Sequence, residues 1–370
     1  MGKKILVLSS HTPSLFIFRK DMIKAFLEAG HEVVAVGNEA EQDWVNKFAE
    51  MGVKYRQTFI QRNGTNPLKD LKTWKDLKKL IKEERPDKIF SYQAKTVIYG
   101  GLAARSRKNV EYYPLIAGIG SVFLGSGLKN KIVRAILKTE YKLALKKSKN
   151  VFFQNSDDVE TFKNNRLIKA EKVVMLNGSG VNLDDFILQE LPNSSTFLCV
   201  SRLIRDKGVA EYLEAAKLVK SKYPNARFLL VGPFDTNPSA LKEADLKPYV
   251  ESGAIEYCGE QKDVRPYLAQ CSVYVLPSYR EGTPKSVLEA MACGKAIITT
   301  DAPGCKETVV SGENGFLVPV KDAESLAEKM TYLIENPQTV QKMAGKSRRI
   351  AEEKFDVKKV NEVILNTMGL

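Results

Sequence analysis

The sequence predicts an α/β protein made of two doubly wound domains with parallel sheets. The chain has 370 residues, which is too long for one ordinary core and suits two domains of about 180 residues each. Short β-branched runs alternate with amphipathic helical stretches through almost the whole chain, the pattern of repeated βα units. An apolar fraction of 44% and a charged fraction of 27% are typical of a globular protein.

The first domain is predicted to span residues 1–178. A helical pattern at 68–84 has one apolar stripe, and Pro86 ends it before the next strand. The strands are expected at residues 4–9, 32–37, 54–59, 88–92, 112–117, 151–154 and 173–176.

The alternation of strand and helix patterns is interrupted at 179–195. This segment contains Gly180, Pro192 and many polar residues, and we interpret it as a linker. The second domain is predicted at 196–355, and 356–370 is helical in pattern and could pack back on the first domain. Two such domains predict a cleft between them, with ligands at the carboxyl ends of the strands. The second-domain strands are expected at 197–201, 227–231, 255–258, 273–276, 296–299 and 316–318.

Several classes of protein are disfavoured by composition. No stretch approaches the ~20 consecutive apolar residues of a membrane span. The first ten residues fit a buried strand better than a signal peptide, so a cytoplasmic location is expected. The five cysteines lack zinc-ligand spacing and only two histidines are present, so we expect buried thiols and no metal site.

Positive charge is concentrated in one predicted helix. The net charge of the chain is +13, and residues 128–149 carry eight cations and one acid, Glu140. Such a surface favours a polyanion, either phospholipid or nucleic acid. A half-buried helix would explain the apolar periodicity but not the charge excess, whereas an interfacial helix on anionic lipid explains both. The sequence shows neither a basic sheet with interleaved aromatic residues nor a recognition-helix pattern, the features typical of nucleic-acid-binding proteins. The expected membrane-facing residues are Phe123, Leu124, Lys129, Lys131, Arg134, Lys138 and Lys142.

The most informative motif follows the predicted strand at 273–276. A turn leads to a helix expected to open near Thr283, with Pro284 in its first turn. The amides at such a helix start form an anion site. Glu281 precedes the helix, and Glu289 lies about two turns inside it on the inward face.

Two cations flank a tight turn after the first strand of the same domain. Arg202 and Lys207 are spaced as two groups reaching one diphosphate would be, and Gly232 supplies a close-approach turn after the next strand. A surface ion-pair cluster is the simpler alternative for the two cations.

Together, Glu281, Glu289, Arg202 and Lys207 make the chain resemble the family-4 retaining glycosyltransferases of the GT-B fold, two Rossmann-like domains facing a cleft. The resemblance covers nearly the whole chain and is sharpest at 197–316. It implies that Arg202 and Lys207 neutralise the donor pyrophosphate, that Glu281 holds sugar hydroxyls and that Glu289 holds the ribose. It makes Glu281, Arg202 and Lys207 the catalytic candidates. The implied nucleotide-sugar site is Arg202, Lys207, Gly232, Asp263, Val264, Glu281, Gly282, Thr283, Pro284, Lys285, Ser286 and Glu289.

The same resemblance points to an acceptor side in the first domain. His11, after the first strand, is either an acceptor-side residue or the cap of a polar turn. Many family members carry a histidine or acid near Ala94 or Ala117, and its absence here puts a protein general base in doubt. Lys95 is either a phosphate contact or a solvated helix start. The acceptor-side candidates are Ser10, His11, Ser14, Lys95, Gly118 and Gly120.

Among family members, the chain is similar to bacterial transferases that extend a sugar on a polyprenyl-diphosphate carrier at the cytoplasmic membrane face. The resemblance implies a UDP-sugar donor, with N-acetylgalactosamine the first choice, and neither cofactor nor metal, because fixed cations and a helix start stabilise the departing phosphate. A GT-B-like UDP-N-acetylglucosamine 2-epimerase and a nucleic-acid-binding protein are the alternatives. The oligomeric state cannot be read from the sequence.

Overall fold

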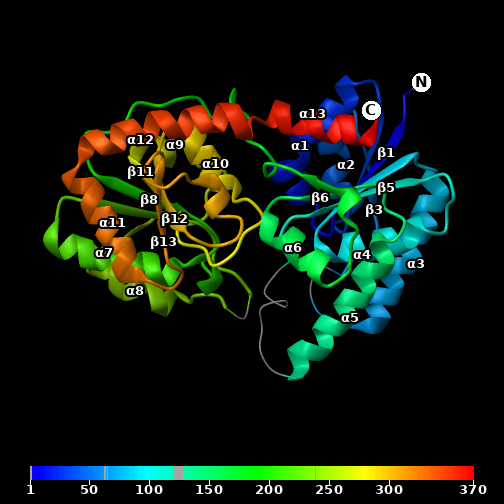
Figure 1. Cartoon of the computed structure of the whole chain (residues 1–370), viewed down its shortest axis with the longest axis horizontal. Helices are drawn as coiled ribbons and strands as arrows, with labels where there is room; N and C mark the ends of the chain where they lie inside the picture. The colour runs from blue at the N-terminus through cyan, green and yellow to red at the C-terminus, as the bar shows by residue number, and fades with distance from the viewer. Residues whose placement is uncertain (1, 62–63, 65, 120–127, 238) are drawn as a thin grey trace. The chain divides into compact units, whose positions relative to one another are not determined.

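The structure, a computed structural model, describes residues 2–61, 64, 66–119, 128–237 and 239–370. It divides into two compact units (Figure 1), unit 1 with residues 1–179 and 359–370, and unit 2 with residues 180–358. The segment 180–195, interpreted above as a linker, lies within unit 2.

Unit 1 is built on a seven-stranded parallel sheet in the order β3-β2-β1-β4-β5-β6-β7. The central strands are apolar and buried on both faces, as a parallel sheet covered by helices requires. The strands are β1 (Lys4–Leu8), β2 (Glu32–Gly37), β3 (Lys54–Gln57), β4 (Lys88–Tyr92), β5 (Glu111–Ile116), β6 (Val151–Phe153) and β7 (Val173–Met175).

The helices of unit 1 cover both faces of this sheet, as two separate buried clusters show. The last helix, α13 (Val357–Met368), places Val360, Ile364 and Met368 in the same cluster as Ile5 and Val7 of β1. Figure 1 shows α13 beside α1. The other helices are α1 (Pro13–Glu28), α2 (Glu41–Ala49), α3 (Pro67–Glu84), α4 (Ala94–Ala104), α5 (Leu128–Leu145) and α6 (Ser156–Asn164).

Unit 2 has a six-stranded parallel sheet in the order β10-β9-β8-β11-β12-β13. The strand order reverses between β8 and β11, because β9 and β10 are added on one side of β8 and β11 to β13 on the other. Doubly wound folds bind ligands at this point of the sheet. The strands are β8 (Thr196–Val200), β9 (Arg227–Val231), β10 (Glu256–Tyr257), β11 (Val273–Leu276), β12 (Ala296–Thr300) and β13 (Gly315–Val318).

The helices of unit 2 bury two further apolar clusters, one on each face of the sheet. Both units therefore have the predicted α/β architecture, and every predicted strand is present within a few residues of its expected position. The helices are α7 (Val209–Lys222), α8 (Glu243–Glu251), α9 (Arg265–Gln270), α10 (Lys285–Ala292), α11 (Ala323–Glu335) and α12 (Pro337–Ile350).

The five cysteines are all free thiols, and four of them are buried. Among the residues that the structure describes, no helix combines the length and the apolar character needed to cross a membrane. Within those same residues, histidine, cysteine and carboxylate side chains nowhere gather in threes that could hold a metal ion.

Candidate active site

The carboxyl ends of β8 and β11 bring two of the predicted residues into contact. Lys207 ends a 3₁₀ turn after β8, Glu281 lies in the loop after β11, and the Lys207 ammonium contacts the Glu281 carboxylate. Their side chains are 22% and 12% exposed. The contact exists because β8 and β11 are neighbours in the sheet, so the loops that follow them meet at one edge.

Backbone contacts hold these two loops together. The amide of Tyr279 donates to the carbonyl of Asp206 at 2.9 Å. Gly208 has φ +70°, and a Cβ atom there would lie 2.0 Å from the carbonyl oxygen of Pro277. Only glycine fits such a close approach in this conformation. These main-chain contacts hold the backbone of Lys207 against the loop that carries Glu281.

Arg202 has a partner that the sequence analysis missed. Its Nη1 lies 2.8 Å from Oδ2 of Asp235, which follows β9, and its side chain is 47% exposed. Gly232 brings the turn after β9 against the turn after β8, since a Cβ atom there would lie 1.8 Å from the carbonyl oxygen of Ser201. Asp235 lies in an irregular loop, where no periodic pattern marks it.

Helix α10 begins at Lys285, with Pro284 as its N-cap. This corrects the expected start near Thr283 by two residues and leaves Gly282 and Thr283 in the preceding loop. The first-turn amides of a helix point along its axis toward anions. Ser286 belongs to this first turn.

Glu289 lies one turn beyond Lys285 on the same helix face. Its side chain is 14% exposed and its Oε1 is 3.9 Å from the Lys285 ammonium. Burial raises the pKa of this carboxyl to about 7, against the opposing effect of Lys285. Burial disfavours the ionised form of this carboxyl, and hydrogen-bond donors on a bound ligand would stabilise that form.

Asp263 and Val264 lie at the start of α9. The Asp263 carboxylate accepts from the Arg265 side chain at 2.9 and 2.8 Å and from the Arg265 amide at 3.0 Å. These hydrogen bonds lower the pKa of Asp263. Val264 is the N-cap residue of the helix. The Asp263 carboxylate is thus hydrogen-bonded to the first residue of α9.

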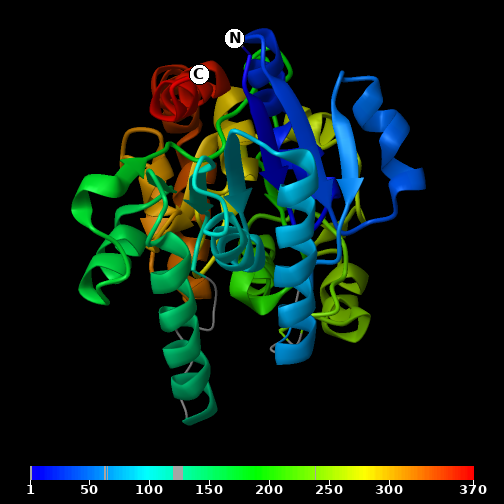
Figure 2. The ribbon, with the colours of Figure 1, turned by 90° about the vertical axis from the view of Figure 1, so that its right-hand side faces the viewer.

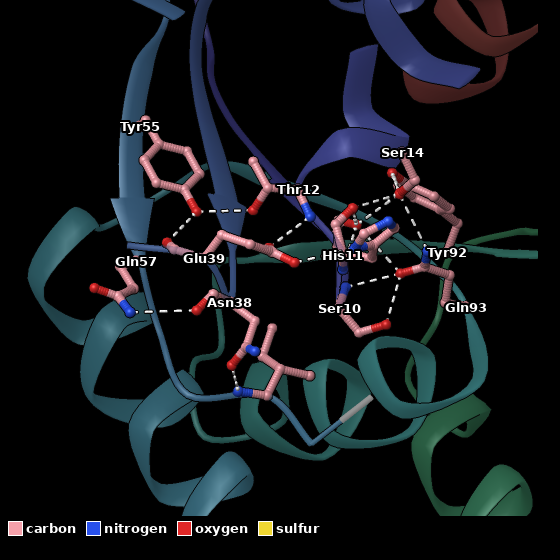
Figure 3. A network of polar contacts seen from close by, with 12 residues as sticks. Ser10, His11, Thr12, Ser14, Asn38, Glu39, Tyr55, Gln57, Tyr92 and Gln93 are labelled. Atoms are coloured by element: carbon pink, nitrogen blue, oxygen red, sulfur yellow. Dashed lines mark hydrogen bonds and ion pairs between the residues drawn. The ribbon is translucent and has the colours of Figure 1, made fainter. Parts of the chain in front are cut away.

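A second polar cluster lies at the carboxyl ends of β1, β2 and β4 in unit 1. Figure 3 shows His11 directed at Glu39 and Gln93 directed at Ser10. His11 Nδ1 is 3.0 Å from Glu39 Oε1, and the amide of Thr12 donates to Glu39 Oε2 at 2.7 Å. Both His11 and Glu39 side chains are 30% exposed.

Glu39 was not identified from the sequence, and it is central to this cluster. Burial alone would raise the pKa of its carboxyl, but hydrogen bonds from Thr12 and His11 outweigh burial and lower the pKa below its ordinary value. Glu39 follows β2, so its position after a strand end was the available signal. The pair fixes the orientation of the His11 ring and leaves its other nitrogen for a further partner.

Gln93 was also missed, and its backbone is unusual. It caps α4 with φ 74°, a positive value rare outside glycine. Its Oε1 accepts from the amide and the hydroxyl of Ser10, both at 2.8 Å. Residues held in such sparsely populated backbone conformations are found more often at functional sites.

The remaining acceptor-side candidates take different positions. Ser10 and Ser14 are buried, and the Ser14 hydroxyl contacts Tyr92 and the carbonyl of His11. Lys95 is not the solvated helix start considered above, because its ammonium lies 2.6 and 2.7 Å from the Asp70 carboxylate oxygens. Gly118 is half-buried with φ +101°. Gly120, Phe123 and Leu124 lie outside the described residues.

The basic helix α5 has two different halves. In its C-terminal half Tyr141, Ala144 and Leu145 are buried in the unit 1 core. In its N-terminal half Ile132 and Ile136 are 56% and 53% exposed. Lys131 and Lys142 are exposed, Arg134 and Lys138 are half-exposed, and the side chain of Lys129 is outside the described set.

Two doubly wound domains with parallel sheets are the architecture of the GT-B fold. The chain belongs to the family-4 glycosyltransferases. The family model for glycosyl transferases group 1 matches residues 194–336, and the model for glycosyl transferase 4-like proteins matches residues 4–155.

Curated relatives agree with this family, and a solved structure has the same fold. The chain is 34% identical to the N,N'-diacetylbacillosaminyl-diphospho-undecaprenol alpha-1,3-N-acetylgalactosaminyltransferase of Campylobacter jejuni, over 90% of each chain. It is 26% identical to the UDP-Gal:alpha-D-GlcNAc-diphosphoundecaprenol alpha-1,3-galactosyltransferase of Escherichia coli, over 73% of this chain and 72% of the relative. Sucrose-phosphate synthase from Thermosynechococcus elongatus has the same fold, with a TM-score of 0.81, 20% identity and coverage of 99% and 98%.

Proposed function

We propose that the chain is a retaining transferase that moves a hexose or N-acetylhexosamine, with N-acetylgalactosamine the first choice, from a UDP-sugar to a polyprenyl-diphosphate-linked saccharide. Both curated relatives above are named for an undecaprenyl-diphosphate-linked acceptor, and one is named for a UDP-sugar donor. Both names specify an α-linkage, which corresponds to retention because UDP-hexoses carry the α configuration. These names favour sugar transfer over epimerisation or nucleic-acid binding.

The contact between Lys207 and Glu281 at adjacent strand ends carries the proposal. Cleavage of the bond between the anomeric carbon and the β-phosphate leaves negative charge on the departing diphosphate. A fixed ammonium stabilises that charge more in the transition state than in the ground state. The first turn of α10 adds positive potential to the same sheet edge. Arg202, which forms an ion pair with Asp235, lies after a strand at this edge as well.

Glu281 and Glu289 serve the two ends of the donor in this proposal. Glu281, beside the Lys207 ammonium, accepts hydrogen bonds from hydroxyls of the transferred sugar. Glu289, buried on α10, accepts from the ribose hydroxyls, and the loop at Asp263 and Val264 presents backbone to the base. Because the side-chain cations and the helix start stabilise the phosphates, the transfer needs no Mg²⁺.

The acceptor oxygen attacks the anomeric carbon from the face that the phosphate leaves. The C–O bond to the phosphate breaks, the new glycosidic bond forms, and the acceptor proton passes to the departing phosphate oxygen. His11, held by Glu39, orients the acceptor hydroxyl. The cations of α5 hold the enzyme on the anionic cytoplasmic face of the membrane, where the acceptor resides.

A transfer assay tests this proposal. Radiolabelled UDP-N-acetylgalactosamine, UDP-N-acetylglucosamine and UDP-galactose are each incubated with an undecaprenyl-diphosphate-linked amino sugar, with and without EDTA. We expect label in the lipid fraction with at least one donor, an α-anomeric product, and an unchanged rate in EDTA. Absence of transfer from every donor contradicts the function, and a β-anomeric product contradicts retention.

A further inference from the structure

A cavity in unit 1 lies where α4 and α5 end and β5 begins, and we name it the amino-edge cavity. Its volume is about 480 Å³, within the range of small-molecule sites. Figure 2 shows one end of α5 projecting away from unit 1, and the cavity lies at its other end, beside Ser148. His11 and Gln93 follow the ends of β1 and β4, at the opposite edge of the sheet. The cavity is therefore separate from the candidate acceptor side.

The lining of the amino-edge cavity is strongly cationic. Six of its described residues are cations, and one, Glu111, is an acid. The cations come from three stretches of the chain, which follow α4, follow α5 and precede β7. The fold thus gathers at one place positive charges that are far apart in the sequence. These cations are Arg105, Arg107, Lys108, Lys147, Lys149 and Lys172.

The acid in the lining is already shared between two lysines. Oε1 of Glu111 lies 3.3 Å from the Lys149 ammonium, and its other carboxylate oxygen contacts the Lys88 ammonium. Burial opposes ionisation of Glu111, but hydrogen bonds, led by the one from Lys88, outweigh burial and lower its pKa. Glu111 is therefore ionised at neutral pH, and it balances no more than one of the six cations.

Three of the other cations contact main-chain carbonyls. The Lys172 ammonium lies 2.7 Å from the carbonyl oxygen of Ser148. The guanidinium groups of Arg105 and Arg107 each lie 3.4 Å from a carbonyl oxygen. Within the described part of the chain, no carboxylate forms an ion pair with any of these three, or with the cations at 108 and 147. Carbonyl groups orient these side chains but leave their charge in place.

Compensation of helix dipoles is the simplest alternative explanation for this cluster. The C-terminus of a helix carries about half a negative charge, so the ends of α4 and α5 together balance about one cation. Glu111 balances another. About four of the six positive charges remain, so the helix ends account for only a small part of the cluster.

The excess charge and the shape of the site favour a multiply charged phosphate anion. The two arginines can each donate two parallel hydrogen bonds to phosphate oxygens. Of the described lining residues, Val110 is half-buried and Tyr112 is buried, and no large apolar side chain is exposed. The projecting half of α5 differs, because Ile132 and Ile136 are exposed there. The lining therefore suits a water-soluble anion better than a lipid.

We propose that the amino-edge cavity is a second anion site, which binds a water-soluble anion of the diphosphate class. Arg105 and Arg107 donate to the phosphate oxygens, and Lys108 and Lys147 add positive charge beside them. Lys207 and Glu281 belong to unit 2, whereas this cavity is built by unit 1 alone. The proposal does not depend on the transferase function proposed above.

Lysine acetylation followed by mass spectrometry of the full chain tests the location of the site. Inorganic diphosphate should protect Lys108 and Lys147 several-fold, and it should leave Lys222, an exposed lysine of unit 2, unprotected. Unchanged acetylation at positions 108 and 147 overturns the proposal. Equal protection by sodium chloride of the same ionic strength shows simple screening and overturns it as well. Protection by phosphatidylglycerol vesicles but not by diphosphate assigns the cluster to the membrane, which also contradicts a soluble ligand.

A matched pair of double variants tests the two arginines. Both are made in a Lys207→Ala chain, so that the donor-side ammonium does not contribute to binding. Arg105→Gln with Arg107→Gln should weaken the binding of inorganic diphosphate, measured by isothermal titration, at least about tenfold, because charge-assisted hydrogen bonds are lost. Arg166→Gln with Arg349→Gln removes the same charge at two exposed arginines outside the cavity and should leave the affinity unchanged. Equal affinities for the two double variants overturn the proposal.

Discussion

Lys207 and Glu281 are 74 positions apart in the chain, yet the lysine ammonium contacts the glutamate carboxylate. The contact joins the loops after β8 and β11, which the sheet order places side by side. A donor diphosphate at this edge would compete with Glu281 for the ammonium. The two residues are therefore expected to have opposite effects on nucleotide binding.

Replacing Lys207 by alanine should lower kcat by roughly 10²–10³-fold, because one fixed donor to the developing phosphate charge is lost. Lys207→Arg should recover part of this loss. Steady-state kinetics with a UDP-sugar check the prediction. Lys217→Ala, at an exposed lysine of α7, is the control and should match the unmodified enzyme. A kcat within twofold of normal for Lys207→Ala would remove this residue from the reaction.

Glu281→Gln should separate binding from turnover. The substitution removes a negative charge beside Lys207, so the affinity for UDP should rise several-fold. It should also lower kcat, because the amide accepts more weakly from the sugar hydroxyls. Isothermal titration with UDP and turnover with the UDP-sugar measure the two effects. Weaker UDP binding together with normal turnover is the opposite pattern and would contradict the assignment.

Glu289 should make the stability of the protein fall as pH rises. Its pKa is raised to about 7, against about 4.3 in an unfolded chain. Between these values the folded form holds a proton that the unfolded form has lost, so stability decreases with rising pH through this window. Relative to the unmodified protein, Glu289→Gln should gain about 2–3 kcal/mol between pH 5 and pH 8.

Denaturant unfolding at several pH values measures this difference. Glu251→Gln is a suitable control, because the Glu251 side chain is 66% exposed and its replacement should leave the pH dependence unchanged. A Glu289→Gln curve parallel to that of the unmodified protein would show that Glu289 titrates normally.

Replacing glycine by alanine should change the free energy of unfolding in opposite directions at Gly232 and at Gly345. Gly232 has φ +148°, and a Cβ atom there would lie 1.8 Å from Ser201 O, whereas at Gly345 in α12 no described atom lies within 4 Å. Gly232→Ala should cost at least about 2 kcal/mol of unfolding free energy. Gly345→Ala should add about 0.5–1 kcal/mol. Urea unfolding tests both, and equal effects would contradict the close approach of the two turns.

The sheets were predictable from the sequence because each strand has a local signature. Apolar β-branched runs bounded by glycine, proline or polar residues mark a strand without reference to the rest of the chain. The strand β12, for example, is buried at every position. The short β10 shows the limit of this signal, since only Glu256 and Tyr257 of the predicted run pair with β9.

The partners of the candidate site residues were less accessible. Asp235 and Glu39 lie in irregular loops, where neither helical nor strand periodicity marks a residue. Their pairing with Arg202 and His11 depends on which strands become neighbours in the folded sheet. The basic helix shows a similar limit, because its apolar periodicity does not distinguish the buried Tyr141 from the exposed Ile136.

The basic helix α5 should bind anionic membranes through its lysines. Lys131, Lys138 and Lys142 lie on one side of the helix, and each cation near an anionic surface contributes about 1 kcal/mol. Replacing all three by glutamine should therefore weaken binding to phosphatidylglycerol vesicles by roughly two orders of magnitude. Vesicle co-sedimentation at increasing salt measures the effect, and salt should abolish binding of the unmodified protein.

A second triple variant separates position from total charge. Replacing Lys217, Lys222 and Lys262, exposed lysines of unit 2, by glutamine removes the same charge elsewhere and should leave vesicle binding nearly unchanged. If both triple variants lose affinity equally, the net charge of the protein governs binding and α5 has no special part in it. If the unmodified protein binds duplex DNA as tightly as vesicles, the basic helix is a general polyanion site, because a membrane-specific surface should discriminate between the two.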